Sequence, residues 1–153
     1  RAALHQYGRS TDTASLVALK SMRDSISPPE NRLDLLEALV ARGEDISPSE
    51  LNAAAVVGGN AVAGEHIVRF HASAQCIRCH AFDGIGGIAG PNLSDVGLRL
   101  KRADLLQSML DPQAVIAEGF GEASAMPAMT EHLTPLQIRD VVAWLSARRL
   151  ATP

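Results

Sequence analysis

The sequence predicts an all-α protein, and three observations carry that prediction. Capping-box patterns, in which Ser or Thr is followed three residues later by Glu or Gln, begin at Ser27, Ser47 and Thr134 and typically start helices. The apolar residues that follow each box recur at helical spacing. No stretch predicts a convincing strand, and no internal repeat is present.

The first 57 residues predict short helices only. Residues 1–12 have no clear pattern, whereas residues 13–26 place Leu16, Leu19 and Met22 at roughly helical spacing. The next helix starts at Ser27 and ends near Gly43, a glycine placed for a left-handed C-terminal cap; its apolar stripe is Leu33, Leu36, Leu39 and Val40. The box at Ser47 begins a short alanine-rich helix that runs to about Val57.

Three longer helices are predicted beyond Gly58-Gly59-Asn60, the flexible stretch that we take as a domain boundary. Residues 61–71 form one helix, with Ile67 and Phe70 on one side. A second helix, residues 101–110, ends before Asp111-Pro112, and its inward residues are Leu105, Leu106, Met109 and Leu110. The last begins at Thr134, with proline at its first position, and its stripe, beside Trp144, is Ile138, Val141, Val142 and Leu145.

The motif Cys76-Ile77-Arg78-Cys79-His80 is the attachment signature of a c-type haem. At this spacing each thiol can form a thioether to a haem vinyl group, and the imidazole of His80 can coordinate the iron from one face. Cys76 and Cys79 are the only cysteines of the chain. We therefore expect one covalent haem c in a domain of residues 58–153, preceded by a helical N-terminal extension of residues 1–57.

A glycine-rich loop, residues 82–97, is predicted to follow the motif. Residues 82–93 contain four glycines and a proline, which indicates backbone lying close against a large flat ligand. A phosphate cradle is excluded, because no Gly-Lys-Ser/Thr follows and no predicted strand precedes the loop. The Gly90-Pro91 pair is placed so that a carbonyl accepts a hydrogen bond from the other ring nitrogen of His80, which would orient the imidazole.

The second axial ligand is expected from a loop well downstream. Residues 113–131 form such a loop and contain Met126 and Met129. We favour Met126 as the iron ligand, because Pro127 stiffens its backbone, and Met129 stays open as the alternative. His132 is the one serious rival among the histidines; surface or packing roles are expected for His66 and His71, and His5 is a ligand only in principle.

Other functions of the cysteine pair fit less well. A thioredoxin-like redox motif needs a strand context, and a zinc site needs a second pair of ligands at zinc-finger spacing. The net charge of −3, without long runs of one sign, suggests neither nucleic acid nor an anionic membrane as a partner. The cluster Arg99, Lys101 and Arg102 is interpreted as a solvated helix start, with a docking patch for a redox partner as the alternative.

The motif also predicts the compartment. In bacteria haem is attached to Cys-x-x-Cys-His outside the cytoplasm, so we expect a periplasmic or other extracytoplasmic protein. The chain has no initiating Met, no signal peptide and no run near the ~20 apolar residues that span a bilayer. Arg1 therefore resembles the start of a processed chain or an excised segment.

The haem motif, the Gly-Pro-Asn-Leu loop, the Met-Pro loop and the C-terminal helix occur in an order that resembles class I cytochrome c, over residues 58–149. The resemblance implies a fold in which the helix of residues 61–71 crosses that of residues 135–148 around one haem, with Gly64 allowing close approach. Val68 stands where the family often has an aromatic residue, so the helix packing is expected to differ. Asn92 replaces the commoner Asp, which should change little.

A closer resemblance, over residues 28–149, is to the haem-binding domain that ends many large planctomycete-type proteins. It rests on the segments 29–43, 63–67, 71–80, 111–120 and 124–129. Those proteins often join a quinoprotein-like β-propeller to HEAT-like helices and then to this cytochrome. The resemblance implies an electron-transfer domain with His80/Met126 ligation and no catalysis of its own, which accepts electrons from a dehydrogenase domain or partner. The alternatives are a haem enzyme or small-ligand sensor with an open or exchangeable sixth site, and an interaction module of residues 1–57 with a mainly structural haem.

Overall fold

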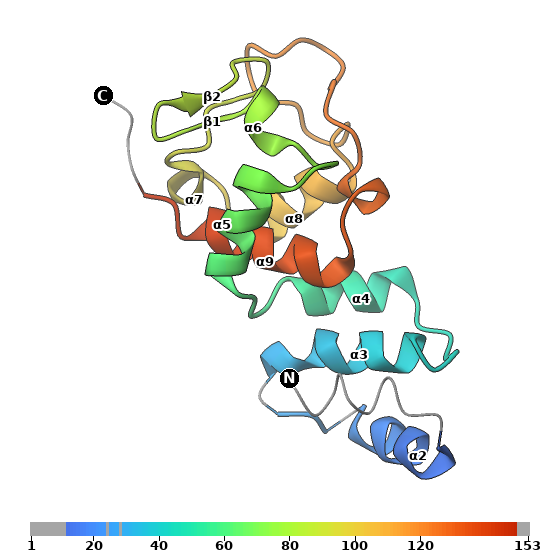
Figure 1. Cartoon of the computed structure of the whole chain (residues 1–153). Helices are drawn as coiled ribbons and strands as arrows, with labels where there is room; N and C mark the ends of the chain where they lie inside the picture. The colour runs from blue at the N-terminus through green and yellow to red at the C-terminus, as the bar shows by residue number, and fades with distance from the viewer. Residues whose placement is uncertain (1–11, 24, 28, 150–153) are drawn as a thin grey trace. The chain divides into compact units, whose positions relative to one another are not determined.

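The computed structural model describes residues 12–23, 25–27 and 29–149, except for the side chain of Glu30. The described residues form two compact units, which divide between Gly58 and Gly59 (Figure 1). Regular structure is helical apart from two strands of two residues each in the described part of the chain. No helix among these residues has the length and apolar character needed to cross a membrane.

The N-terminal unit contains α2 (Thr13–Met22), the 3₁₀ turn η1 (Pro29–Asn31), α3 (Arg32–Val40) and α4 (Pro48–Ala55). Its core is made of leucines from α2 and α3, which are at most 1% exposed: Leu19, Leu33, Leu35, Leu36 and Leu39. Val40, predicted as part of the buried stripe, is 44% exposed, because it follows the last buried turn of α3. Gly43 adopts the predicted left-handed conformation, with φ of 83°.

One helix end and one helix start were predicted wrongly in this unit. α2 ends at Met22 rather than at residue 26, and Asp12 caps its start by accepting a hydrogen bond from the Ser15 N–H at 2.7 Å. α3 begins at Arg32, after η1, rather than at Ser27. The capping box predicted at Ser27 rests on Pro28 and on the Glu30 side chain, which lie outside the described residues.

The capping box at Ser47 is formed on one side. The Ser47 hydroxyl accepts a hydrogen bond from the Glu50 N–H at 3.2 Å, but the Glu50 carboxylate contacts Arg23 at 2.6 Å and Arg32 at 2.9 Å. A guanidinium is a stronger partner for a carboxylate than a backbone N–H. Glu50 therefore ties α4 to the start of α3 and the end of α2, and the hydrogen bond from Arg23 lowers its pKa.

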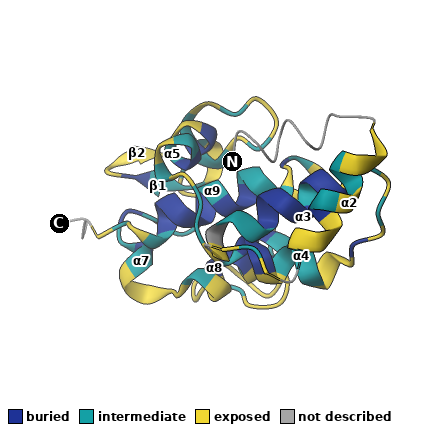
Figure 2. Cartoon of the chain, turned by 90° about the horizontal axis from the view of Figure 1, so that it is seen from below, coloured by how far each residue is buried: buried dark blue, intermediate teal, exposed yellow. Residues whose placement is uncertain are grey.

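The C-terminal unit is built on two crossing helices, α5 (Ala61–Phe70) and α9 (Pro135–Ser146) (Figure 1). Gly64 lies at their contact, since a Cβ there would lie 2.0 Å from the backbone oxygen of Asp140. The crossing predicted from the family resemblance is thus present, and Gly64 permits it. α9 is largely buried (Figure 2), including all four residues of its predicted stripe: Ile138, Val141, Val142 and Leu145.

The caps of these helices use local side chains. Thr134 and Gln137 form the predicted reciprocal capping box at 3.3 and 2.9 Å. Asn60 caps α5 by accepting from the N–H groups of Val62 and Ala63, and its own N–H donates to Asp140 at 2.7 Å. The start of α5 is therefore tied to the middle of α9.

The predicted inward side of α5 was wrong in one residue. The buried residues are Gly64, Ile67 and Val68, whereas Phe70 is 69% exposed and lies against the exposed ring of His66 at 5.2 Å between centroids. Gly64 must face α9 at the closest point of the crossing, and this orients the helix. Phe70, at the last residue of the helix, then points outside the contact.

The predicted loop of residues 82–97 contains regular structure. After α6 (Cys76–Cys79), strands β1 (Ala81–Phe82) and β2 (Ile85–Gly86) pair antiparallel around Asp83 and Gly84. Both turn residues have positive φ, 54° and 78°, as in a type I′ hairpin turn. The Asp-Gly dipeptide is a signal for such a hairpin, so the sequence contained evidence that the prediction of no strand overlooked.

The remaining elements are α7 (Val96–Arg99), α8 (Arg102–Leu110) and the 3₁₀ turn η2 (Met129–Glu131). α8 begins one residue later than predicted, where Asp104 accepts a hydrogen bond from the Lys101 N–H at 3.0 Å. Leu105, Leu106 and Met109 are buried as predicted, and Leu110 is partly exposed.

Candidate haem-binding site

The two cysteines lie on one helical turn, α6. The turn follows Gln75, which has a left-handed backbone with φ of 45°, and it closes with a hydrogen bond from the His80 N–H to the Cys76 carbonyl at 3.0 Å. Both thiols are free; Cys76 is partly buried and Cys79 is exposed. Burial raises the pKa of the Cys76 thiol. Two reduced thiols three residues apart on a helix share one face, as a thioether pair to one ligand requires.

His80 is held by the carbonyl group that the sequence predicted. Its Nδ1 lies 2.8 Å from the carbonyl oxygen of Pro91. A carbonyl only accepts hydrogen bonds, so Nδ1 carries the proton and the lone pair is left on Nε2. Burial lowers the pKa of His80, and the Pro91 carbonyl opposes that shift. A neutral imidazole with a free Nε2 is the form that coordinates a metal.

Glycines of the following loop lie against the motif itself. A Cβ at Gly90 would lie 2.5 Å from Cε1 of His80, and one at Gly87 would lie 1.9 Å from the Arg78 carbonyl oxygen. Hydrogen bonds from the Gly87 and Gly90 N–H groups to Ile77 and Cys79, at 2.9 and 2.8 Å, fix this approach. The sequence predicted the Gly90-Pro91 pair as the source of the carbonyl, but it did not show that the small size of Gly90 makes room for the imidazole.

The two candidate methionines differ in their surroundings. Met129 is 3% exposed and belongs to η2, which packs on α8 and α9. Met126 is partly exposed, and its N–H donates to the Ser124 hydroxyl at 3.2 Å. The segment that precedes Met126 is closed by the Gln113 side chain, which forms two hydrogen bonds with the Ser124 backbone, at 2.9 and 3.0 Å. The structure thus brings Cys76, Cys79, His80 and Pro91 together, while Met126 lies on a separate loop.

The other histidines have local roles or exposed positions. His71 follows α5, and its Nδ1 accepts a hydrogen bond from the Ala74 N–H at 3.3 Å. His66 is exposed against Phe70. His132 is partly exposed, and its N–H donates to the Met129 carbonyl at 3.0 Å. His5 lies outside the described residues.

Two of the three cations in the predicted basic cluster have partners within the chain. Arg99 pairs with Asp95 at 2.9 Å, and Arg102 donates to the Ser146 hydroxyl at 3.1 Å. Burial and the nearby Arg139 lower the pKa of Arg102. These contacts favour a structural role at the starts and ends of helices over a docking patch.

The residues present fit a covalently attached haem. Two unoxidised thiols share one turn, and an oriented imidazole with its Nε2 lone pair follows them directly. Gly90 leaves the imidazole its space. This donor set, with nitrogen on one side and thiols for attachment, matches the chemistry of a c-type haem.

Comparison with known proteins agrees with this chemistry. A model of the cytochrome c family matches residues 66–148. The chain is 39% identical over 74 residues to a cytochrome c6 of Nostoc sp. This alignment covers 48% of this chain and 60% of that protein. The chain is 29% identical over 134 residues to a cytochrome c2 of Rhodospirillum rubrum, covering 71% and 96%.

A cytochrome c6 of Gloeothece citriformis is 34% identical over 74 residues, covering 48% of this chain and 61% of that protein. The chain thus spans about three fifths of the length of the cytochromes c6 that it matches. No solved structure matches the chain. The matched family region begins in α5 and includes the haem motif, its loops and α9. The chain therefore belongs to the cytochrome c family, with the class I fold predicted from its sequence and a covalently bound c-type haem as its cofactor.

Proposed function

We propose that the protein transfers electrons through one haem attached at Cys76 and Cys79, with His80 and Met126 as axial ligands and no catalysis of its own. The observation that carries the proposal is the hydrogen bond between Nδ1 of His80 and the Pro91 carbonyl, because it leaves Nε2 oriented and unprotonated. In this proposal residues 58–153 form the haem domain, and residues 1–57 form a helical N-terminal extension.

Each residue has a distinct task. When bound, the haem supplies a one-electron couple between ferric and ferrous iron. The thiols anchor it covalently, Nε2 of His80 donates to the metal, and Pro91 keeps the imidazole from rotating and strengthens it as a donor. The thioether of Met126 favours the ferrous ion and closes the sixth position to substrates.

The choice of Met126 over Met129 is supported by burial. Met129 is 3% exposed within the packing of η2, where methionine commonly fills gaps in a core. Met126 lies on the loop tied by Gln113 and Ser124 and is partly exposed. Its side chain is thus the one that can turn to a ligand without opening the core.

We further propose that electrons arrive from a dehydrogenase, either an attached domain or a separate partner, in a periplasmic or other extracytoplasmic compartment. The support is the resemblance of residues 28–149 to the planctomycete-type haem-binding domain, together with the similarity to cytochromes c6 and c2. The chemistry of the motif, which is loaded outside the cytoplasm in bacteria, supports the compartment.

The test is the visible spectrum of the haem-loaded protein, oxidised and reduced, for wild type, Met126→Ala and Met129→Leu. We expect c-type bands and a long-wavelength methionine–ferric band in wild type and Met129→Leu, and loss of that band in Met126→Ala. Loss in Met129→Leu with retention in Met126→Ala would reverse the assignment. Wild type without the band, and with bands that shift on adding carbon monoxide or cyanide, would indicate an open site and favour an enzyme or a sensor.

A further inference from the structure

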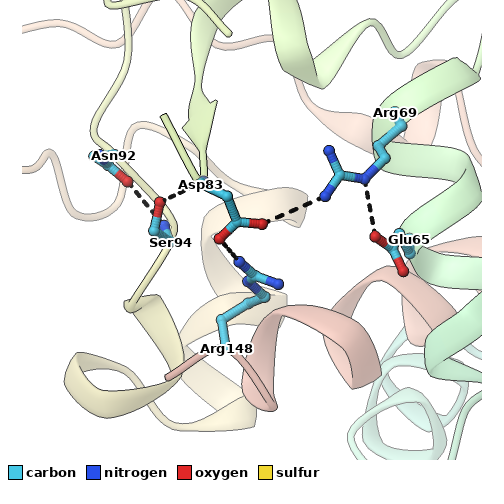
Figure 3. A network of polar contacts seen from close by, with 6 residues as sticks. All are labelled: Glu65, Arg69, Asp83, Asn92, Ser94 and Arg148. Atoms are coloured by element: carbon cyan, nitrogen blue, oxygen red, sulfur yellow. Dashed lines mark hydrogen bonds and ion pairs between the residues drawn. The ribbon is translucent and has the colours of Figure 1, made fainter. Parts of the chain in front are cut away.

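A buried serine holds the loop that carries the Pro91 carbonyl. Ser94 is 0% exposed, and its hydroxyl oxygen accepts a hydrogen bond from the Asp83 N–H at 2.8 Å. Its own N–H donates to the side-chain oxygen of Asn92, also at 2.8 Å. Figure 3 shows Ser94 between these two residues. Ser94 thus fixes the turn that immediately follows Pro91 and fastens it to the β1–β2 hairpin.

Asp83 is itself held from several sides. Its carboxylate pairs with Arg148, just beyond α9, and with Arg69 of α5 at 3.4 Å (Figure 3). Arg69 also pairs with Glu65 one helical turn earlier, at 2.9 Å. The backbone of Asp83 is in the left-handed region, with φ of 54°, so the turn has little freedom to shift. The hairpin that Ser94 contacts is therefore anchored to both crossing helices.

The Pro91 carbonyl is fixed from both ends of a short segment. Upstream, the Gly90 N–H donates to Cys79 at 2.8 Å; downstream, the Leu93 N–H donates to Ala81 at 3.0 Å. The Ser94 hydroxyl adds a side-chain contact at the downstream end. Removing the hydroxyl would leave the Asp83 N–H without this acceptor, which favours displacement of the two segments from each other. Displacement there would lengthen the bond to His80.

We propose that Ser94 is a positioning residue for the haem: through Asp83 and Asn92 it holds the Pro91 carbonyl on His80 and thereby helps to set the reduction potential. The inference rests on the proposed function, because it requires His80 to bind the iron. A firm hydrogen bond at Nδ1 makes the imidazole a stronger donor, which favours ferric iron. Weakening this hydrogen bond shifts the ferric–ferrous equilibrium toward ferrous iron.

The experiment compares haem-loaded wild type, Ser94→Ala and Ser108→Ala. Ser108 is the control, because its hydroxyl also forms a hydrogen bond with a backbone group: it donates to the Asp104 carbonyl at 2.9 Å, within α8 and away from the haem motif. We expect Ser94→Ala to shift the ferric–ferrous equilibrium about threefold toward ferrous, which is about 30 mV at 59 mV per tenfold. We also expect the Nδ1 proton of His80 to exchange with solvent about fivefold faster by NMR. Ser108→Ala should change neither quantity.

The inference fails if Ser94→Ala binds haem and keeps both the reduction potential and the His80 Nδ1 exchange rate of wild type. A serine with only a structural role would lower the stability of the protein and leave these two quantities unchanged. If Ser94→Ala does not fold, Asn92→Ala replaces it. Asn92 is exposed, and its loss removes the acceptor for the Ser94 N–H; a smaller shift in the same direction is expected, and none would overturn the inference. Failure of the proposed function is distinct, because wild type itself would then lack the histidine and methionine signatures.

Discussion

Gly64 of α5 lies directly against the backbone carbonyl of Asp140 in α9. A Cβ at position 64 would be 2.0 Å from that oxygen and 3.0 Å from the Trp144 Cβ. Backbone cannot give way as a flexible side chain does, so the helices must separate to admit a methyl group. This contact sets the distance between the two helices that frame the haem domain.

The first prediction follows from this contact. Gly64→Ala should lower the free energy of unfolding by about 3 kcal/mol through overpacking, despite the better helix propensity of alanine. Urea denaturation followed by circular dichroism measures it. Gly43→Ala is the control, because no atom lies within 4 Å of its Cβ and φ of 83° alone disfavours alanine; about 1 kcal/mol is expected there. Equal losses in the two variants would contradict the assigned role of Gly64.

A second prediction concerns the imidazole of the haem site. In Gly90→Ala the new methyl group would meet the His80 ring at 2.5 Å, so the ring should rotate away from Pro91. We expect a heterogeneous ferric spectrum and at least twofold lower haem incorporation in cells that attach c-type haem. Gly119→Ala is a matched loop variant with positive φ and open space around the new Cβ. A wild-type spectrum and yield for Gly90→Ala would show that the site tolerates the shift.

The third prediction tests the arginine on Trp144. The guanidinium of Arg148 lies 4.9 Å from the centre of the Trp144 ring and pairs with Asp83. Arg148→Ala should therefore cost about 1.5 kcal/mol of stability, from the loss of both contacts, and should alter Trp144 fluorescence. Arg99→Ala removes a more exposed ion pair with Asp95 and should cost less than about 0.5 kcal/mol. The reverse order of the two losses would refute the argument.

The fourth prediction is a pH dependence in the N-terminal unit. The hydrogen bond from Arg23 lowers the pKa of Glu50 from its usual value of 4.5. A lowered pKa in the folded state stabilises the protein above the unfolded value and loses that effect as the pH falls through the folded value. Melting temperature should therefore fall less steeply between pH 5 and pH 3 in Glu50→Gln than in wild type. The control variant Asp45→Asn, at an exposed position, should keep the wild-type dependence of melting temperature on pH. Identical slopes for wild type and Glu50→Gln would exclude the proposed effect of Glu50.

Local signals in the sequence were sufficient for much of the fold. The capping box at Thr134 and the stripe that follows it predicted α9, because a helix start and its buried face depend on residues within a few turns. The hairpin at Asp83-Gly84 was equally local and was overlooked. In contrast, the exposure of Phe70 depends on how α5 lies on α9, and spacing along one helix carries no information about the partner helix.

By itself the sequence determined that the candidate haem-attachment residues lie together: Cys76, Cys79 and His80 are so close in the chain that their grouping needs only one helical turn. It also indicated Pro91 as the partner of His80, eleven residues away. Only the tertiary structure decided that Gly90 makes room for the imidazole, that Ser94 anchors the Pro91 loop, and that Asp83 meets an arginine 65 residues later. The physical reason is that these contacts depend on three-dimensional packing of segments whose spacing in the chain leaves their mutual positions open.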